Sequence, residues 1–196
     1  MEKTAIIILA AGNSSRLGSP KQLLEFNGQT LIRHVVSEAL LSNSDVLLVT
    51  GSQFSEIEKD VQELDVVLVR NPDWEMGMGS SVRIGTQRAL ELFPDVDQVI
   101  LAVCDQPFVS ASVFRSLIGK AALSPQNIVA SSYSETAGTP VLFKKKYFSE
   151  LLVSDGKRGA KKLVENNPQD LVMVAFPKGE IDIDTKSDYE KLTQKP

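Results

Sequence analysis

The sequence predicts an α/β fold in which a doubly wound, mainly parallel sheet lies between two layers of helices, a three-layer α/β/α arrangement. Short apolar segments rich in β-branched residues recur along the chain, as expected for strands that are covered on both faces. Amphipathic segments of helical length separate them, and this alternation implies right-handed crossovers. Hydrophobic residues make up 42% of the 196 residues, which is enough for a full core. We expect one domain over residues 1–196, because the sequence has no linker, internal repeat or low-complexity tract.

The individual elements follow one another in alternating order. The segments predicted as buried strands are Ala5–Leu9, Val46–Thr50, Val66–Val69, Val99–Val103 and Ile128–Ala130. The segments between them that are predicted as helices are Thr30–Leu41, with Thr30 as its N-cap, Phe54–Gln62, Ser80–Leu92 and Ser110–Leu123. After about residue 133 the pattern is looser, and we expect an apolar segment Val141–Phe143, two further helices, a strand Leu171–Ala175 and a closing segment Ile181–Asp184.

The charge balance and the single cysteine exclude several classes of protein. Lys and Arg number 21 against 25 Asp and Glu, a net charge of −4, which argues against a nucleic-acid-binding protein. Cys104 is the only cysteine, so the chain can form neither an intrachain disulfide nor a cysteine-built metal site. The apolar run near the N-terminus is too short to span a membrane, and we expect a cytoplasmic protein with no membrane partner.

The loop after the first predicted strand has the composition of an anion-binding loop. Residues 9–21 read LAAGNSSRLGSPK, and such small residues let the backbone approach a ligand and direct N–H groups at an anion. From Lys3 to Leu24 the chain has three basic residues and no acid, the local charge that a polyphosphate requires. The spacing matches neither the P-loop nor the Gly-x-Gly-x-x-Gly pattern. A flexible connection with incidental charges is the alternative that the residues leave open.

A second loop, residues 70–81, also follows a predicted strand and opens a helix. It reads RNPDWEMGMGSS, and Val82 stands where a dinucleotide-binding pattern would place its third glycine. Ser80 or Ser81 acts here either as the N-cap of the helix or as a ligand contact. Trp74, the only tryptophan, is interpreted as a packing anchor rather than a platform for a flat substrate ring.

Acidic residues mark two other places in the chain. Asp105 follows the predicted strand Val99–Val103, where an unpaired buried carboxylate would cost several kcal/mol. We therefore favour a Mg²⁺ ligand over a turn or N-cap residue, since Mg²⁺ is held by one or two carboxylates together with phosphate oxygens. In the closing segment, alternation places Asp182 and Asp184 on one face of an extended strand.

Several separated motifs together resemble one known family. Residues 9–21 match Leu-Ala-Ala-Gly-x-Ser-x-Arg-x-Gly-x-x-Lys, and residues 71–81 match Asn-Pro-x-Trp-x-x-Gly-x-x-x-Ser. Residues 104–107 match Gly-Asp-Gln-Pro with Cys104 in place of the glycine, and residues 182–185 match an Asp-Ile-Asp-Thr ending. The chain is similar in these motifs to nucleotidyltransferases with a nucleotide-diphospho-sugar transferase-like Rossmann fold. Within them it resembles the molybdenum cofactor cytidylyltransferase group, relatives of molybdopterin guanylyltransferase.

The resemblance implies a role for each matching residue. The residues expected to contact the nucleotide are Leu9, Ala10, Ala11, Gly12, Arg16, Lys21, Asn71, Ser80, Ser81 and Asp105. Of these, Arg16 and Lys21 are expected to hold phosphates and, with Asp105, to be catalytic. Asp105 and Asp184 are expected to bind Mg²⁺, and Cys104 is expected to be a bystander. Residues 138–140 match a turn that faces the acceptor, and residues 156–161 loosely match Gly-Asp-x-Gly-Ala-Arg, with Lys157 and Lys161 as departures.

The activity implied by the resemblance is transfer of CMP from CTP to the terminal phosphate of a molybdopterin-type cofactor, with release of pyrophosphate. Ala11 points to CTP rather than GTP. The expected partners are CTP, the molybdopterin-type acceptor and a client molybdoenzyme of the xanthine dehydrogenase type. Three alternatives stay open: guanylyl transfer, a different phosphorylated acceptor, or a non-catalytic carrier of the finished cofactor.

Overall fold

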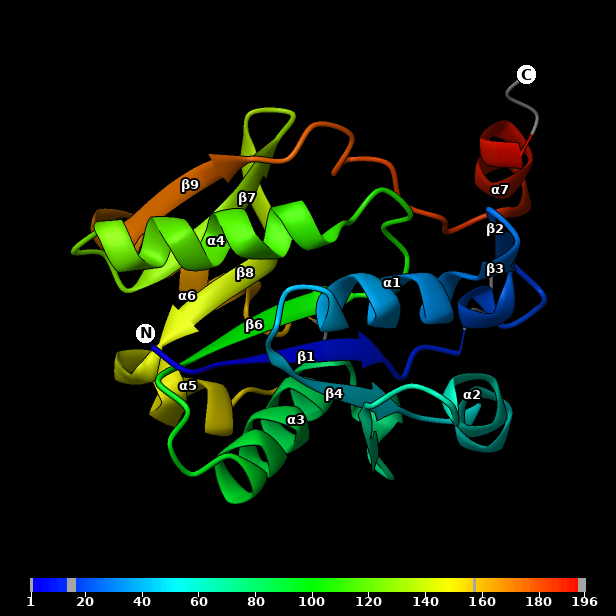
Figure 1. Ribbon diagram of the computed structural model, residues 1–196, viewed down its shortest axis with the longest axis horizontal. Helices are drawn as coiled ribbons and strands as arrows, with labels where there is room; N and C mark the ends of the chain where they lie inside the picture. Colours follow the sequence, from blue (N-terminus) through cyan, green and yellow to red (C-terminus); the bar gives the residue numbers. More distant parts are fainter. Residues whose placement is uncertain (1, 14–16, 157, 194–196) are drawn as a thin grey trace.

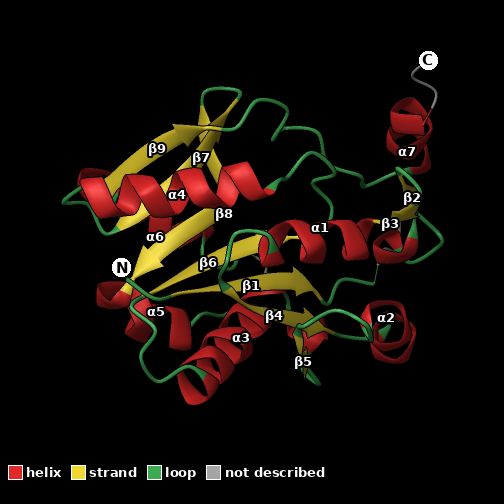
Figure 2. Cartoon of the chain, viewed as in Figure 1, coloured by secondary structure: helices red, strands yellow, loops and turns green. Residues whose placement is uncertain are grey.

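The computed structural model describes residues 2–13, 17–156 and 158–193. Its main sheet has seven strands: β1 (Thr4–Ala10), β4 (Asp45–Thr50), β5 (Val67–Arg70), β6 (Gln98–Val103), β7 (Ile128–Tyr133), β8 (Thr136–Lys144) and β9 (Leu171–Ala175). Their order across the sheet is β5-β4-β1-β6-β8-β7-β9 (Figures 1 and 2). β8 runs antiparallel to both its neighbours, and the other pairs are parallel. A small hairpin of β2 (Glu25–Phe26) and β3 (Gln29–Thr30) precedes the first helix.

Helices cover both faces of the sheet. They are α1 (Leu31–Leu40), α2 (Phe54–Val61), α3 (Met78–Leu92), α4 (Ala111–Leu123), α5 (Phe148–Leu152), α6 (Lys161–Asn166) and α7 (Lys186–Thr193). α1, α2 and α4 pack with Ile6 and Ile8 on one face, whereas α3, α5 and α6 pack with Ile7 and Leu9 on the other. Because neighbouring residues of β1 point to opposite faces, both faces need apolar side chains, and the strand is apolar throughout. The predicted α/β fold is confirmed. In the described part of the chain, no helix is both long and apolar enough to cross a bilayer.

The strand order reverses direction at β1, and this position indicates where a ligand is expected. Ile8 of β1 is paired with Leu48 of β4 on one side and with Ala102 of β6 on the other. The chain therefore continues from β1 in one direction to β4 and β5, and returns on the other side as β6. Ligands of doubly wound sheets bind beyond the carboxyl ends of the strands at such a switch point.

The largest difference from the expected elements is β8, which the sequence pattern indicated only over its three apolar residues. The Gly138-Thr139-Pro140 motif, expected to be a turn, lies inside this strand, and the Thr139–Pro140 peptide bond is cis. The pairing with β7 shifts register here, because Val141 pairs with Ala130 and Gly138 with Ser131. Proline has no N–H to donate to the sheet, and it is tolerated at such an irregularity because the regular hydrogen bonding is interrupted there.

The start of α3 also differs from the prediction. The helix begins at Met78 with Gly77 as its N-cap, and the Ser80 hydroxyl donates 2.8 Å to the Gly77 carbonyl from inside the first turn. Ser80 and Ser81 are therefore not the N-cap. The prediction for α1 is confirmed, because Thr30 Oγ1 accepts a 3.2 Å hydrogen bond from Arg33 N.

Candidate active site

Three predicted site residues from distant parts of the chain meet beyond the carboxyl ends of β1 and β6. Lys21 Nζ lies 2.5 Å from Asp105 Oδ2 and 3.1 Å from Asp184 Oδ1. The side chains are 16%, 20% and 34% exposed, respectively. One ammonium group thus lies between two carboxylates that are 79 residues apart. Arg16, the other basic residue expected on the phosphates, lies outside the described residues.

The closing segment reaches the site without forming a strand. Residues 181–184 have no strand assignment, and the segment is attached by a 3.0 Å hydrogen bond from Ile183 N to the carbonyl of Asp105. Ile183 is fully buried in a small cluster with Leu17, Phe26 and Leu31. The expected strand is wrong because no neighbouring strand is present to pair with it. The alternation of side chains persists, so Asp184 is directed toward Lys21.

The first loop is held by a side chain that the sequence analysis did not identify. Gln22 is fully buried in the short 3-10 helix Lys21–Leu23, and its Nε2 donates to the carbonyls of Ala10 (2.9 Å) and Gly12 (2.8 Å). These two bonds fix the backbone at the end of β1, at Ala10 and Gly12. A glutamine that directly follows the predicted phosphate-binding lysine was the available signal, but its partners are backbone carbonyls, which no residue pattern reveals.

The Asp105 carboxylate and burial shift the pKa values of Lys21, Asp182 and Cys104. Burial disfavours the charged ammonium of Lys21, but the attraction of the Asp105 carboxylate outweighs it and raises the pKa of Lys21 above its usual value. For Asp182, burial and the nearby Asp105 and Asp184 carboxylates raise the pKa. Burial, reinforced by the Asp105 charge, raises the pKa of the Cys104 thiol to about 12, so this group stays protonated and is no nucleophile at neutral pH.

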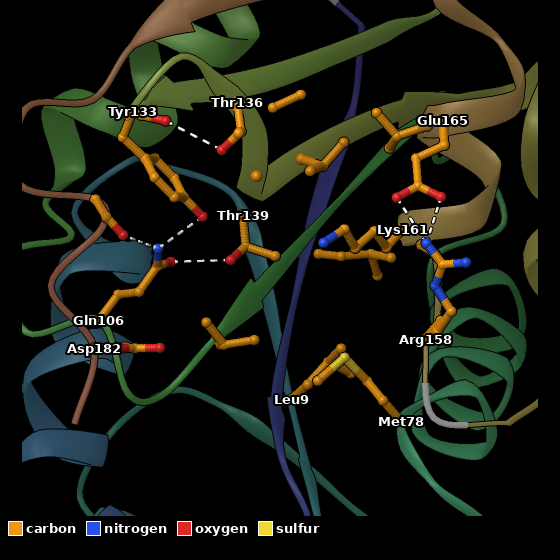
Figure 3. A pocket seen from close by; sticks show the side chains of 18 of the residues that line it. Leu9, Met78, Gln106, Tyr133, Thr136, Thr139, Arg158, Lys161, Glu165 and Asp182 are labelled. Carbon is orange, nitrogen blue, oxygen red and sulfur yellow. Dashed lines mark hydrogen bonds and ion pairs between the residues drawn. The ribbon is translucent and has the colours of Figure 1, made fainter. Parts of the chain in front are cut away.

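Two cavities share Leu9 and Met78 in their walls; Asp105 lines the larger one, whereas Lys21 and Asp184 line neither. The smaller, of about 480 Å³, is lined by the first loop and by the start of α3. The larger, of about 850 Å³, extends from Asp105 and Asp182 past the apolar floor of the sheet to α6 (Figure 3). A cleft of this kind, apolar with a few convergent polar groups, is typical of a small-molecule site.

The predicted nucleotide contacts separate into two groups. Those that line the smaller cavity are Leu9, Ala11, Gly12 and Ser81. Asn71 and Ser80 line neither cavity: the Asn71 amide donates 2.9 Å to both Ser80 Oγ and Ser81 Oγ, and Ser80 Oγ in turn donates to the carbonyls of Asp73 and Gly77. In this structure Asn71 and Ser80 therefore organise the loop that carries Ser81. Ala10 is likewise absent from both linings.

The larger cavity contains polar residues that the sequence analysis did not identify. Gln106, Tyr133 and Thr139 line the wall next to Asp105 (Figure 3). On the opposite wall, Arg158 Nη2 contacts both Glu165 carboxylate oxygens at 2.8 and 2.6 Å, so part of its charge is balanced within the chain. Lys161, a departure from the family motif, lies on this wall too, whereas Lys157 lies outside the described residues.

The donor set of the site fits a divalent cation that is shared with a phosphate ligand. Among the described residues, no group of three or more His, Cys, Asp and Glu side chains gathers that would hold a metal by protein ligands alone. Asp105 and Asp184 already share one cation, the Lys21 ammonium, and both carboxylates contact it from one side of the sheet. Two carboxylates completed by phosphate oxygens and water are the usual protein environment of Mg²⁺.

Several curated proteins are similar to this chain over most of its length. Purine catabolism protein PucB of Bacillus subtilis is 28% identical and aligns over 95% of this chain and 94% of its own length. The molybdenum cofactor cytidylyltransferase of Escherichia coli is 26% identical over 93% and 92%, respectively. The bifunctional protein GlmU of Francisella philomiragia is 30% identical over 81% of this chain, which spans only 36% of the length of GlmU.

A solved structure agrees over the whole chain. The crystal structure of Rv0371c from Mycobacterium tuberculosis superposes with a TM-score of 0.83 and 27% identity, covering 99% of this chain and 98% of that one. The same protein has also been crystallised in complex with manganese, and that structure superposes with a TM-score of 0.79. The sequence profile described as a MobA-like NTP transferase domain matches residues 6–171. The chain therefore belongs to the MobA-like NTP transferase family.

Proposed function

We propose that the protein is a Mg²⁺-dependent cytidylyltransferase that transfers CMP from CTP to the terminal phosphate of a molybdopterin-type acceptor. The observation that carries this proposal is the meeting of Lys21, Asp105 and Asp184, with Asp105 in the wall of the larger of two adjoining cavities. One cavity is required for the nucleotide and one for the acceptor, and the two phosphates must come together. Two carboxylates that can hold a metal ion and a neighbouring ammonium suit a transfer between two phosphates.

In this proposal the nucleoside occupies the smaller cavity, between the first loop and Ser81, and the acceptor occupies the larger one. An oxygen of the acceptor phosphate forms a bond to the α-phosphorus of CTP. The bond from that phosphorus to the oxygen that bridges to the β-phosphate breaks, and pyrophosphate leaves with the electron pair. A phosphate monoester is largely ionised near neutral pH, so no protein general base is required. The protein contributes positioning and charge neutralisation.

The residues have distinct roles in this scheme. Asp105 and Asp184 would hold Mg²⁺, which supplies charge neutralisation and alignment of the phosphates when it is bound. Lys21 supplies a positive charge beside the departing pyrophosphate, and Arg16 is expected to add a second one. Gln22 keeps the first loop in place, because it fixes the carbonyls on either side of Ala11.

The choice of CTP, of the acceptor and of Mg²⁺ is supported by the relatives and by Ala11. The Escherichia coli relative is named a molybdenum cofactor cytidylyltransferase, and the Rv0371c structure with manganese supports a divalent cation in this fold. The cytidylated product would then pass to a client molybdoenzyme of the xanthine dehydrogenase type. PucB, which covers the chain equally well, carries a name from purine catabolism, so other phosphorylated acceptors must be included in any test.

The test is pyrophosphate release from the purified protein with Mg²⁺, each of the four nucleoside triphosphates, and a panel of molybdopterin-type cofactor, sugar phosphates and polyol phosphates. We expect release only with CTP and the molybdopterin-type acceptor. Pyrophosphate release with another pair of nucleotide and acceptor would show that the proposed reaction is right and the proposed substrates are wrong. Binding of the cofactor without consumption of any nucleotide would contradict the proposal and identify a carrier. A thermal-shift comparison of the four nucleotides with Mg²⁺ gives an independent measure of the base preference.

A further inference from the structure

The segment that delivers Asp184 is attached at two points to the turn that follows β6, and both attachments come from consecutive residues of that turn. At one end, Ile183 N donates to the backbone carbonyl of Asp105 at 3.0 Å. At the other end, Gln106 Nε2 donates to the carbonyl of Gly179 at 2.7 Å. Residues 179–183 are therefore held between these two hydrogen bonds. Asp184, the proposed metal ligand, directly follows Ile183, the residue that bonds to Asp105.

The side chain of Gln106 is itself fixed on all its polar atoms. It is 4% exposed, its Oε1 accepts from Thr139 Oγ1 at 3.1 Å, and its Nε2 also lies 3.3 Å from the Tyr133 hydroxyl (Figure 3). These contacts determine which end of the amide faces Gly179. A buried amide that bonds to three separate segments costs free energy to disturb, because any partner left behind is unsatisfied.

Close packing adds to the same attachment. The ring of Tyr133 lies against the backbone of two glycines: a Cβ on Gly179 would lie 2.4 Å from Tyr133 Cδ1, and a Cβ on Gly138 would lie 2.0 Å from the hydroxyl. Phe176, just before the segment, meets the same ring edge-to-face with the centroids 6.1 Å apart. The chain between β9 and Asp184 thus packs closely against Tyr133 and is hydrogen-bonded to Gln106.

From this arrangement we infer that Gln106 is a positioning residue, which holds residues 179–184 so that Asp184 faces Asp105. Its side chain acts through the backbone of Gly179, and its neighbour Asp105 holds the other end of the segment. Loss of the Gln106 amide would release one end, and Asp184 would then sample positions too far from Asp105 for both carboxylates to contact one cation. The consequence for the metal rests on the proposed function, whereas the attachment of the segment does not.

Gln106→Met is the direct test, because methionine keeps the length and burial of the side chain and removes its hydrogen bonds. Gly179→Ala disturbs the same attachment from the other side without changing Gln106. The matched controls are Gln98→Met, which removes a 1% exposed glutamine bonded to Thr4 at the other end of β6, and Gly119→Ala, where a Cβ meets no atom within 4 Å.

Two measurements separate the inference from the proposed function. The first is hydrogen exchange of the amides of residues 179–184 in the protein without ligands. We expect about tenfold faster exchange there in Gln106→Met and Gly179→Ala, and no local change in the controls. The second is binding of Mn²⁺ in the presence of CTP, followed by the loss of the free Mn²⁺ signal in electron paramagnetic resonance. We expect about tenfold weaker binding in the two test variants only, as is usual when support for a metal ligand is removed.

The outcomes are distinct. Unchanged exchange of residues 179–184 in Gln106→Met would overturn the attachment, whatever the enzyme does. Faster exchange with undiminished Mn²⁺ binding would overturn the positioning of Asp184 by Gln106. If the unaltered protein binds no Mn²⁺ with CTP, the proposed function fails, and the exchange data alone decide whether Gln106 holds the segment.

Discussion

Lys21 lies between two carboxylates, and its single positive charge offsets part of their negative charge. A nucleoside triphosphate and a divalent cation would each replace one partner of these ion pairs. The phosphates would attract the ammonium, and the cation would attract the carboxylates. Under the proposed function, the same ammonium would support nucleotide binding and would compete with metal binding when no nucleotide is present.

Replacement of Lys21 by methionine separates these two effects. We expect Mn²⁺ alone to bind about tenfold more tightly to Lys21→Met, because two neighbouring carboxylates lose their counter-charge, and CTP with Mn²⁺ to bind about tenfold more weakly. Titration calorimetry of each ligand measures both changes. Lys3→Met, which removes an exposed lysine paired with Asp95, is the control. Equal Mn²⁺ affinity in Lys21→Met and the unaltered protein would contradict the competition.

Asp105→Asn tests whether the Asp105 carboxylate holds the metal ion. An asparagine keeps an oxygen for Lys21 but loses the charge that Mg²⁺ requires, so we expect the rate of pyrophosphate release to fall at least about a hundredfold while the circular dichroism spectrum is unchanged. Asp97→Asn, an exposed acid before the start of β6, should leave the rate unaltered. Full activity of Asp105→Asn at saturating Mg²⁺ would remove Asp105 from the metal site.

At the scale of elements, Asp170 connects three segments at the amino-terminal side of β7 and β9. It ends the 3-10 helix Pro168–Asp170 and accepts hydrogen bonds from Asn127 N (2.9 Å), Tyr147 Oη (2.9 Å) and Lys146 Nζ (2.7 Å). Burial opposes the charge of this carboxylate, which is 13% exposed, but the hydrogen bonds outweigh it and lower the pKa of Asp170 below its usual 3.8.

The direction of this pKa shift predicts how stability depends on pH. A group whose pKa is lowered by folding stabilises the protein above its unfolded pKa, and this contribution is lost as the pH falls through the folded value. We expect Asp170→Asn to lower the free energy of unfolding by about 1–3 kcal/mol at pH 7. The difference should shrink steadily below about pH 4, as urea unfolding between pH 7 and pH 3 would show. A constant difference over this range would contradict the assignment.

The strands in the interior of the sheet have the clearest sequence pattern, and the partly buried edge strands β5 and β9 were also predicted from their apolar residues. β1, β4 and β6 lie in the middle of the sheet, and a strand covered on both faces is apolar at every position. β8 also lies between two strands, but its first half borders the larger cavity and contains glycine, threonine and proline. This half therefore lacks the apolar pattern of a buried strand. The short β2–β3 hairpin was not expected, because two-residue strands have no periodicity to detect.

The site was predictable to the extent that its chemistry lies in charged side chains. Asp105 stood out because a carboxylate at the end of a buried strand needs a partner, whereas the roles of Lys21 and Asp184 were implied by the resemblance of their motifs to the family. Gln22 and Gln106 did not stand out, since a buried amide that bonds to distant backbone carbonyls has no signature in the sequence. For the same reason the bonds from the Asn71 amide to Ser80 and Ser81 were not foreseen, and the nucleotide contact that the resemblance implies for Asn71 stays a prediction.

At the scale of the whole molecule, Cys104 provides a probe of cooperative opening. The thiol is 2% exposed at the end of the central strand β6, and its raised pKa keeps it protonated. We expect reaction with a thiol-specific chromogenic reagent at pH 8 to be at least about a thousandfold slower in the native protein than in urea, because labelling requires the core to open. Rapid labelling of the folded protein would show that the carboxyl end of β6 opens locally.

The route by which Asp184 reaches the site has a consequence for the protein during its synthesis. Translation delivers the first loop early and Asp105 midway, and the sheet from β5 to β8 can assemble before residues 179–184 exist. Until residues 179–184 have emerged and docked, a nascent chain would hold most of the sheet and only one of the two carboxylates. A product that stops before residue 179 should then lack the proposed activity, which depends on this segment as well as on the sheet.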